Sequence, residues 1–143
     1  MQQACKVYRE KIENRLKERH LTWGLLDKKY KYGYYAINMI KKEGVVSPFK
    51  LIQLSKLLDI DYHELADTSD VPEILLRRTL LGLTLKDVAE MVGCTVHYLN
   101  KVELGKESNP EFENEVDEAL DELEGIDNDY TSRLISSVMR YSY

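Results

Sequence analysis

The sequence lacks the features of a membrane protein or a secreted protein. No run of 18 apolar residues occurs, and the basic N-terminus lacks the apolar stretch of a signal peptide. Cys5 and Cys94 stand alone, which fits a reducing cytosol better than a disulfide scaffold. Only 3 prolines and 7 glycines occur among 143 residues, so we expect few long segments without regular structure. These absences favour a cytoplasmic protein of one domain or two small ones, with no membrane contact.

Motifs for catalysis are also missing. The sequence has no glycine-rich phosphate loop, no nucleophile elbow and no helix with two histidines at metal-ligand spacing. The three histidines, His20, His63 and His97, are widely separated. We therefore expect no enzyme activity, no cofactor and no metal site.

The net charge of −5 is unevenly distributed along the chain. Residues 1–69 carry 13 basic and 9 acidic side chains, a net charge of +4, whereas residues 70–143 carry 7 and 16, a net charge of −9. Eleven acidic residues and no Lys or Arg occur between Glu107 and Asp129. The first half therefore offers the more favourable surface for a polyanion.

Apolar residues recur at helical spacing along almost the whole chain, and no segment alternates as a strand would. We therefore predict an all-α protein, whose first helix includes Val7 and whose last helix carries Tyr130 to Met139. The predicted N-caps are Thr22, Ser47, Thr84 and Thr95, and the predicted stops are Gly44, Gly93 and Gly125. Asp87, three residues after Thr84, suggests a capping box.

The second half of the chain repeats the first at a spacing of 62 residues. This shift superposes Leu21-Thr22 on Leu83-Thr84, Leu26 on Val88, Ile37 on Leu99, and Ile40 on Val102. A period of this length repeated twice indicates two similar small helical domains rather than a solenoid. We predict domains at 1–68 and 69–143, joined by a linker near 67–72.

Residues 83–110 contain the residue types that two crossing helices and a tight turn require. Ala89 is small enough for a helix crossing, Gly93 can adopt a positive φ, and Leu99 supplies an aliphatic anchor six residues later. This segment resembles the lambda-repressor/Cro-like (XRE) helix-turn-helix family. Residues 15–65 resemble the family too, as a degenerate copy: Asp27 replaces the small residue and Lys31 the turn glycine, with Gly33 placed to take over the turn.

The resemblance implies two compact helical bundles whose second motif helix enters the major groove of DNA. The implied function is a sequence-specific, double-stranded DNA-binding transcriptional regulator, and the small size suggests a repressor of phage or mobile-element type. Family members of this kind commonly bind as homodimers in the cytoplasm of a bacterial or phage-infected cell. Alternatively, the internal repeat lets one chain cover two unequal half-sites.

Candidate DNA-contacting residues follow from the motif positions and nearby lysines. In the first copy they are Lys28, Lys29, Lys31, Tyr32, Gly33, Tyr34, Tyr35, Asn38, Lys41 and Lys42. In the second copy they are Thr84, Lys86, Thr95, Val96, His97, Asn100 and Lys101. An alternative is that Tyr30, Tyr32 and Tyr34 belong to the core and that the lysines form an ordinary solvated face.

The acidic second half supports a rival class of function. The chain could be a protein-binding helix-turn-helix module, such as an antirepressor or an inhibitor of a host or defence protein, that uses the acidic helix 111–124. That helix could equally be a solvated outer face, because its apolar stripe explains why it forms. The segment 130–143 is apolar enough either to dimerise or to cover the second domain's core.

Overall fold

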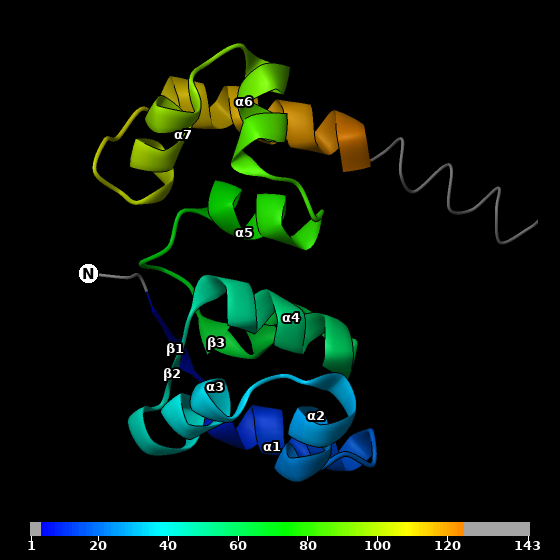
Figure 1. Cartoon of the computed structure of the whole chain (residues 1–143). Coiled ribbons are helices and arrows are strands. Elements are labelled where there is room, and N and C mark those ends of the chain that lie inside the picture. Colours follow the sequence, from blue (N-terminus) through cyan, green and yellow to red (C-terminus); the bar gives the residue numbers. More distant parts are fainter. Residues whose placement is uncertain (1–3, 125–143) are drawn as a thin grey trace, which may run out of the picture.

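A computed structural model describes residues 4–124 of the chain (Figure 1). Its first half contains β1 (Cys5–Val7), α1 (Arg9–Glu18), α2 (Trp23–Tyr30), α3 (Tyr34–Asn38), the π-helical turn η1 (Met39–Glu43), β2 (Val45–Val46) and α4 (Pro48–Leu58). It continues with the 3-10 turn η2 (Tyr62–Glu64), β3 (Ala66–Asp67), α5 (Glu73–Leu80), α6 (Leu85–Val92), α7 (Val96–Glu103) and a helix over residues 110–124. None of the helices described is long and apolar enough to cross a membrane.

The expectation of an all-α fold is wrong in one respect, because the first half contains a small antiparallel sheet of order β2-β1-β3. Cys5 pairs with Val46, and Val7 pairs with Ala66, so Val7 lies in a strand rather than in the first helix. The three strands have only two or three residues each. Such strands are too short for a period-2 pattern to be visible in the sequence. Asp67, expected in a linker, is paired in β3.

The predicted helix starts are confirmed by hydrogen bonds at the caps. Thr22 accepts from the Leu25 amide, and the Thr95 side chain accepts from the Tyr98 amide at 3.1 Å. The remaining confirmed caps and stops are Ser47, Thr84, Gly44 and Gly93. The predicted stop at Gly125 and the last predicted helix lie outside the described residues.

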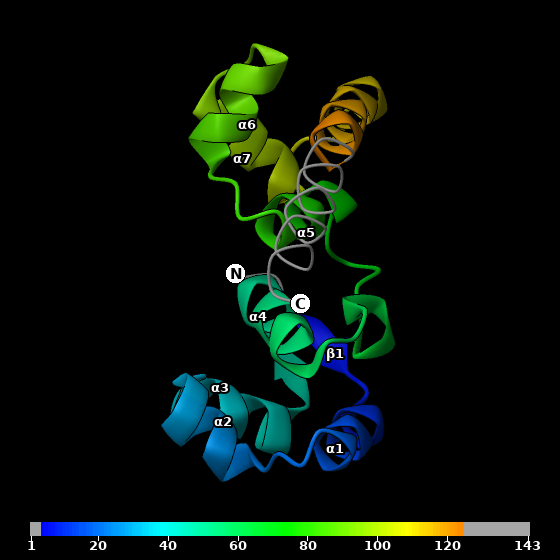
Figure 2. The same cartoon turned by 90° about the vertical axis from the view of Figure 1, so that its right-hand side faces the viewer.

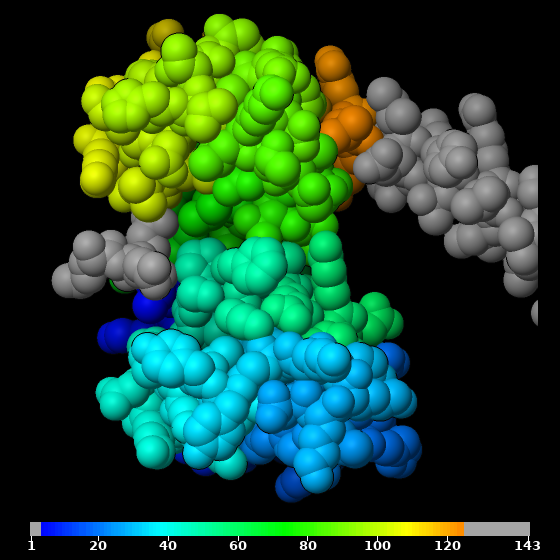
Figure 3. Space-filling model, viewed as in Figure 1, coloured from blue at the N-terminus to red at the C-terminus, as the bar shows by residue number. Residues whose placement is uncertain are grey.

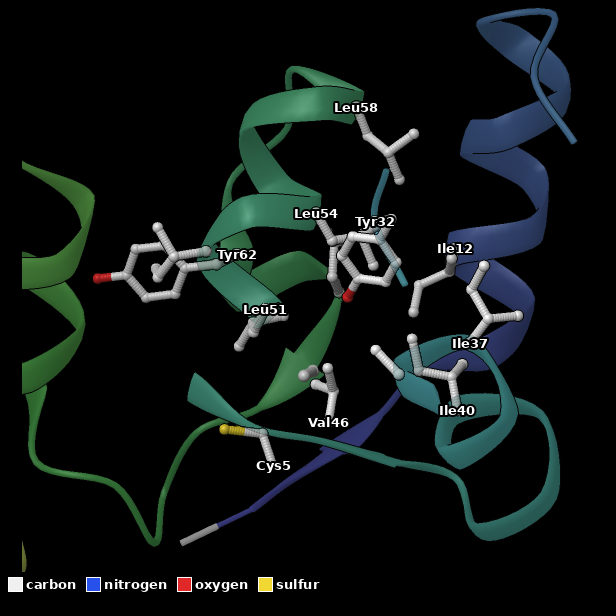
Figure 4. Close-up of a cluster of buried hydrophobic side chains, with 14 of the residues drawn as sticks. Cys5, Ile12, Tyr32, Ile37, Ile40, Val46, Leu51, Leu54, Leu58 and Tyr62 are labelled. Atoms are coloured by element: carbon white, nitrogen blue, oxygen red, sulfur yellow. The ribbon is translucent and has the colours of Figure 1, made fainter. Parts of the chain in front are cut away.

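Two clusters of buried side chains form the core of the described chain. The first lies among the sheet and helices α1 to α4, and Figure 4 shows its central residues around Leu51 and Leu54. The second lies among α6, α7 and the helix over 110–124. Helix α5 belongs to both clusters, since Leu76 is buried in the first and Ile74 in the second. The division into domains 1–68 and 69–143 therefore stays a prediction, with α5 packed against α4 across it.

The helix over residues 110–124 is anchored to the rest of the second half at two places. At its start, the Asn109 side chain accepts from the Phe112 amide and donates to the Tyr98 hydroxyl at 2.8 Å. Further along, the Arg77 guanidinium of α5 donates to the carboxylates of Asp117 and Asp121, and also to that of Glu124. The single positive charge of Arg77 is thus shared among three carboxylates of this helix.

Candidate nucleic-acid interface

Helices α6 and α7 form a tight two-helix unit. Thr84 and Asp87 make a complete capping box, in which each side chain accepts a hydrogen bond from the other residue's backbone amide. Helix α6 ends at Gly93, whose φ of 74° lies in the left-handed region that favours glycine. Two residues later Thr95 caps α7. The local sequence thus determines where both helices end and how short the turn between them is.

Packing between α6 and α7 fixes their crossing. Val88 and Ala89 of α6 are buried, as are Leu99 and Val102 of α7. Ala89 has the small side chain that allows the helices to approach closely. The prediction of Ala89 and Leu99 as buried anchors of this unit is confirmed.

A buried ion pair that sequence reasoning missed attaches α7 to α5. The Arg78 guanidinium donates to both carboxylate oxygens of Glu103, at 2.8 and 2.9 Å. Arg78 also donates to the carbonyl oxygen of Leu83 at 2.7 Å. Only 3% of the Glu103 side chain is exposed. The sequence signal for this pair is the position of Glu103, an acidic residue directly after the buried Val102 at the end of an amphipathic helix.

The candidate residues of the second half lie at the surface around the start of α7. We call this set the C-terminal surface: Thr84, Lys86, Thr95, Val96, His97, Asn100 and Lys101. All are exposed except Asn100 and Lys101, which are half-buried one turn further along α7. The set offers hydroxyl, imidazole, amide and ammonium groups, all able to donate hydrogen bonds.

Helices α2 and α3 have the same local design with different residues. Thr22 caps α2, and Lys31 itself adopts the left-handed conformation at the end of that helix, with a φ of 54°. Gly33 also has a positive φ, 115°, and precedes α3. The expectation that Gly33 replaces Lys31 in the turn is therefore corrected: both residues adopt positive φ.

Most of the first-half candidates are exposed, and we call them the N-terminal surface: Lys28, Lys29, Lys31, Gly33, Tyr34, Tyr35, Asn38, Lys41 and Lys42. Gly33 and Asn38 are half-buried, and the others are exposed. Tyr34 and Tyr35 are 70% and 78% exposed. The alternative that Tyr30 and Tyr34 belong to the core is wrong, because Tyr30 is also 39% exposed.

Tyr32 is removed from the candidate surface. Its side chain is fully buried, and its hydroxyl donates to the carbonyl oxygen of Lys50 at 2.9 Å. Burial also raises the pKa of this phenol well above its usual range. The Lys50 ammonium donates back to the Tyr32 carbonyl and lies 4.9 Å from the ring centroid. Tyr32 therefore packs the turn before α3 against α4 and cannot contact DNA.

The two helix pairs lie on one side of the molecule. Figures 1 and 2 show α2 and α3 on the same side as α6 and α7, with α1 and the helix over 110–124 on the opposite side. In the space-filling view, residues of α3 and α7 reach the same exposed face (Figure 3). The start of the acidic helix nevertheless contacts the first turn of α7, where the rings of Phe112 and Tyr98 lie 4.9 Å apart.

Comparison with known families gives one match, in the second half of the chain. Residues 74–114 match a helix-turn-helix family model of the XRE type. The matched XRE-type segment runs from α5 through α7 into the start of the following helix. The match does not extend to residues 15–65, so it gives no support to a second tandem copy. Neither the curated proteins nor the solved structures contain a match to the chain.

Among residues 4–124, no group of three or more His, Cys, Asp or Glu side chains is placed to hold a metal ion. A cluster around His63 joins the two halves, because this side chain lies 3.0 Å from both Asp61 and Glu73. Cys94 occupies the turn between α6 and α7, where burial raises the pKa of its thiol. Within residues 4–124, His63 contacts neighbouring carboxylates and Cys94 is packed in a turn, so we assign both a structural role.

Proposed function

We propose that the protein is a sequence-specific double-stranded DNA-binding transcription regulator, with α7 as the helix that enters the major groove. The observation that carries this proposal is the fixed α6–α7 unit in an XRE-type segment, with an exposed polar start of α7. Binding at a promoter would repress transcription by blocking polymerase. Within this proposal, the protein is a repressor of phage or mobile-element type that acts in the cytoplasm.

The side chains of the C-terminal surface divide into two roles. Lys86 and Lys101 supply ammonium groups for phosphates, a contribution that is independent of sequence and weakens with salt. Asn100 has an amide suited to the donor and acceptor pair on the edge of adenine. Thr95 and Val96 offer small groups for base edges and thymine methyls. The combination gives both affinity and discrimination.

The first experiment is to incubate the purified chain with fragmented genomic DNA from its source at two salt concentrations and to sequence the retained fragments. Recovery of a few discrete sites at both concentrations is the expected result. Uniform retention that disappears at the higher salt concentration would indicate a non-specific basic patch, and no retention at either would refute the proposal.

Two variants then separate the roles on a recovered site. Asn100→Ala should relax discrimination at one base pair and cost about 1–3 kcal/mol of binding free energy. Lys101→Ala should weaken binding to all sequences and reduce the slope of log K against log salt by about 1. Lys17→Ala is the matched control, because Lys17 is an exposed lysine of α1 on the opposite side of the molecule. Equal effects of Lys101→Ala and Lys17→Ala would contradict the assigned surface.

A second candidate function rests on the helix over residues 110–124. Four exposed carboxylates, Glu111, Glu115, Glu118 and Glu122, are spaced along the side of this helix opposite its buried residues Phe112, Val116 and Leu120. Such a stripe suits a basic protein partner, as in an antirepressor or an inhibitor of a host or defence protein. Replacing all four glutamates by glutamine should leave DNA binding intact and abolish capture of such a partner. A loss of DNA affinity in this variant would contradict the assignment.

A further inference from the structure

The first half repeats several helix boundaries of the XRE-type segment, although α3 continues into η1 and β2, which have no counterpart after α7. At the spacing of 62 residues, the helix N-caps Thr22 and Ser47 correspond to Thr84 and Asn109, and each of these side chains accepts a hydrogen bond from an amide three residues later. Two of the left-handed residues correspond too: His20 to Gly82, and Lys31 to Gly93. Helices α2 and α6 both have eight residues.

The buried positions follow the same register. Side chains buried in the first half correspond to buried side chains in the second half: Ile12 to Ile74, Leu26 to Val88, Ile37 to Leu99, Ile40 to Val102, Leu54 to Val116, and Leu58 to Leu120. The agreement extends from α1 to α4 and from α5 to the helix over 110–124. It therefore includes both the helix before the motif and the helix after it.

Three residues of this half depart from the residue types of the XRE-type segment. His20 and Lys31 stand where Gly82 and Gly93 would be expected, and they adopt left-handed φ values of 57° and 54° without being glycine. Asp27, half-buried, replaces the small buried Ala89. The backbone geometry is thus kept while the residue types that define the pattern are lost.

The two helix pairs are joined through α5 and lie on the same side of the molecule. Helix α5 contributes Leu76 to the first buried cluster and Ile74 to the second. The Tyr62 hydroxyl donates to the Glu73 carboxylate at 2.6 Å, which links η2 to the start of α5. Figures 1 and 2 place both helix pairs on one side, and Figure 3 shows α3 and α7 on a shared face. A ligand long enough to reach both would contact both at once.

We propose that the N-terminal surface is a second DNA-binding site, and that one chain binds two adjacent segments of one continuous duplex. Five exposed lysines, Lys28, Lys29, Lys31, Lys41 and Lys42, match the polyanionic backbone of DNA. Because the two surfaces carry different side chains, the recognised site is bipartite and has no two-fold symmetry. This inference rests on the proposed function and adds the form of the DNA site and the number of chains bound.

The test uses hydroxyl-radical footprinting of the full chain on a site recovered from genomic DNA, together with the mass of the complex in solution. The expected result is one chain per duplex and two protected segments. The triple variant Lys28→Ala/Lys29→Ala/Lys31→Ala should lose protection of one segment and lower the slope of log K against log salt by about 2–3. Its matched control is Lys11→Ala/Lys17→Ala/Arg19→Ala, which removes three charges from α1 and the residue that follows it, and should leave both segments protected.

A change in the DNA separates this inference from its rivals. Inserting five base pairs between the protected segments turns one by about half a helical turn, so only one segment should stay protected. The inference would be overturned by a palindromic site that is occupied by two chains and to which the lysine triple variant binds no more weakly than its control. That result would indicate a homodimer that uses α7 alone. Absence of any footprint would instead refute the proposed function itself.

Discussion

The buried ion pair between Arg78 and Glu103 yields the sharpest stability prediction. The Arg78 side chain is 14% exposed, and replacement of Glu103 by alanine leaves it the Leu83 carbonyl oxygen as its remaining hydrogen-bond acceptor in the described structure. Removing one partner of a buried pair costs about 3–5 kcal/mol, because the other charge is left without compensation. We expect Glu103→Ala to lower the free energy of unfolding of the second half by that amount.

Urea unfolding followed by far-UV circular dichroism measures the loss for the whole chain. Fluorescence of Trp23, the only tryptophan, reports the first half alone. The double variant Arg78→Met/Glu103→Leu should recover most of the stability, since neither charge then remains to be desolvated. Glu13→Ala is the control: it removes the exposed Arg9–Glu13 pair and should cost less than about 1 kcal/mol.

Two results would refute this reasoning. The first is a loss below about 1 kcal/mol in Glu103→Ala, which would mean that water or another group compensates Arg78. The second is a double variant no more stable than the single one. That outcome would place the cost in lost packing rather than in an uncompensated charge.

Three further predictions concern single positions. His20→Gly should raise the free energy of unfolding by about 1 kcal/mol and Gly82→Ala should lower it by a similar amount, as measured by urea unfolding. Both positions have left-handed φ values, which glycine adopts more readily than other residues. An added Cβ at Gly82 meets nothing within 4 Å, so the expected loss there comes from the backbone alone. Leu99→Ala should cost about 2–5 kcal/mol in the same assay, since its side chain is fully buried between α6 and α7. Burial lowers the pKa of His63, but the neighbouring carboxylates of Glu73 and Asp61 together raise it more, so the net pKa lies above its ordinary value of 6.5. A raised pKa stabilises the folded state below about pH 6.5, and this gain is lost as the pH rises through the pKa of His63 in the folded protein. The free energy of unfolding of the wild type relative to His63→Gln should therefore fall between about pH 6 and pH 8. A difference that stays constant with pH would contradict this prediction.

Helix boundaries could be predicted because their determinants are local. Thr84, Thr95 and Ser47 each bond an amide only three residues away, and Gly93 needs only its own backbone freedom. The same holds for the buried stripe of α6, which follows from helical spacing. Most of the α6–α7 unit was therefore visible in the sequence before any three-dimensional information.

The features that sequence reasoning missed depend on residues far apart in the chain. The sheet joins Cys5 to Val46, and the buried ion pair joins residues 25 positions apart. Tyr32 looked like a surface aromatic beside lysines, yet it is buried because α4 folds over it and offers the Lys50 carbonyl oxygen. No local pattern distinguishes it from its exposed neighbour Tyr34.

A net charge of −5 does not conflict with DNA binding, because the effect of a charge depends on its position. At physiological ionic strength, interactions between exposed charges are largely screened beyond about 8 Å. The acidic helix over 110–124 lies on the side opposite α6, and Arg77 pairs with three of its carboxylates. The exposed lysines from Lys28 to Lys42 belong instead to the side that carries both helix pairs. These lysines add positive potential on that side, where α6 also carries the exposed carboxylates of Asp87 and Glu90, whereas the carboxylates of the far helix face solvent or a basic partner.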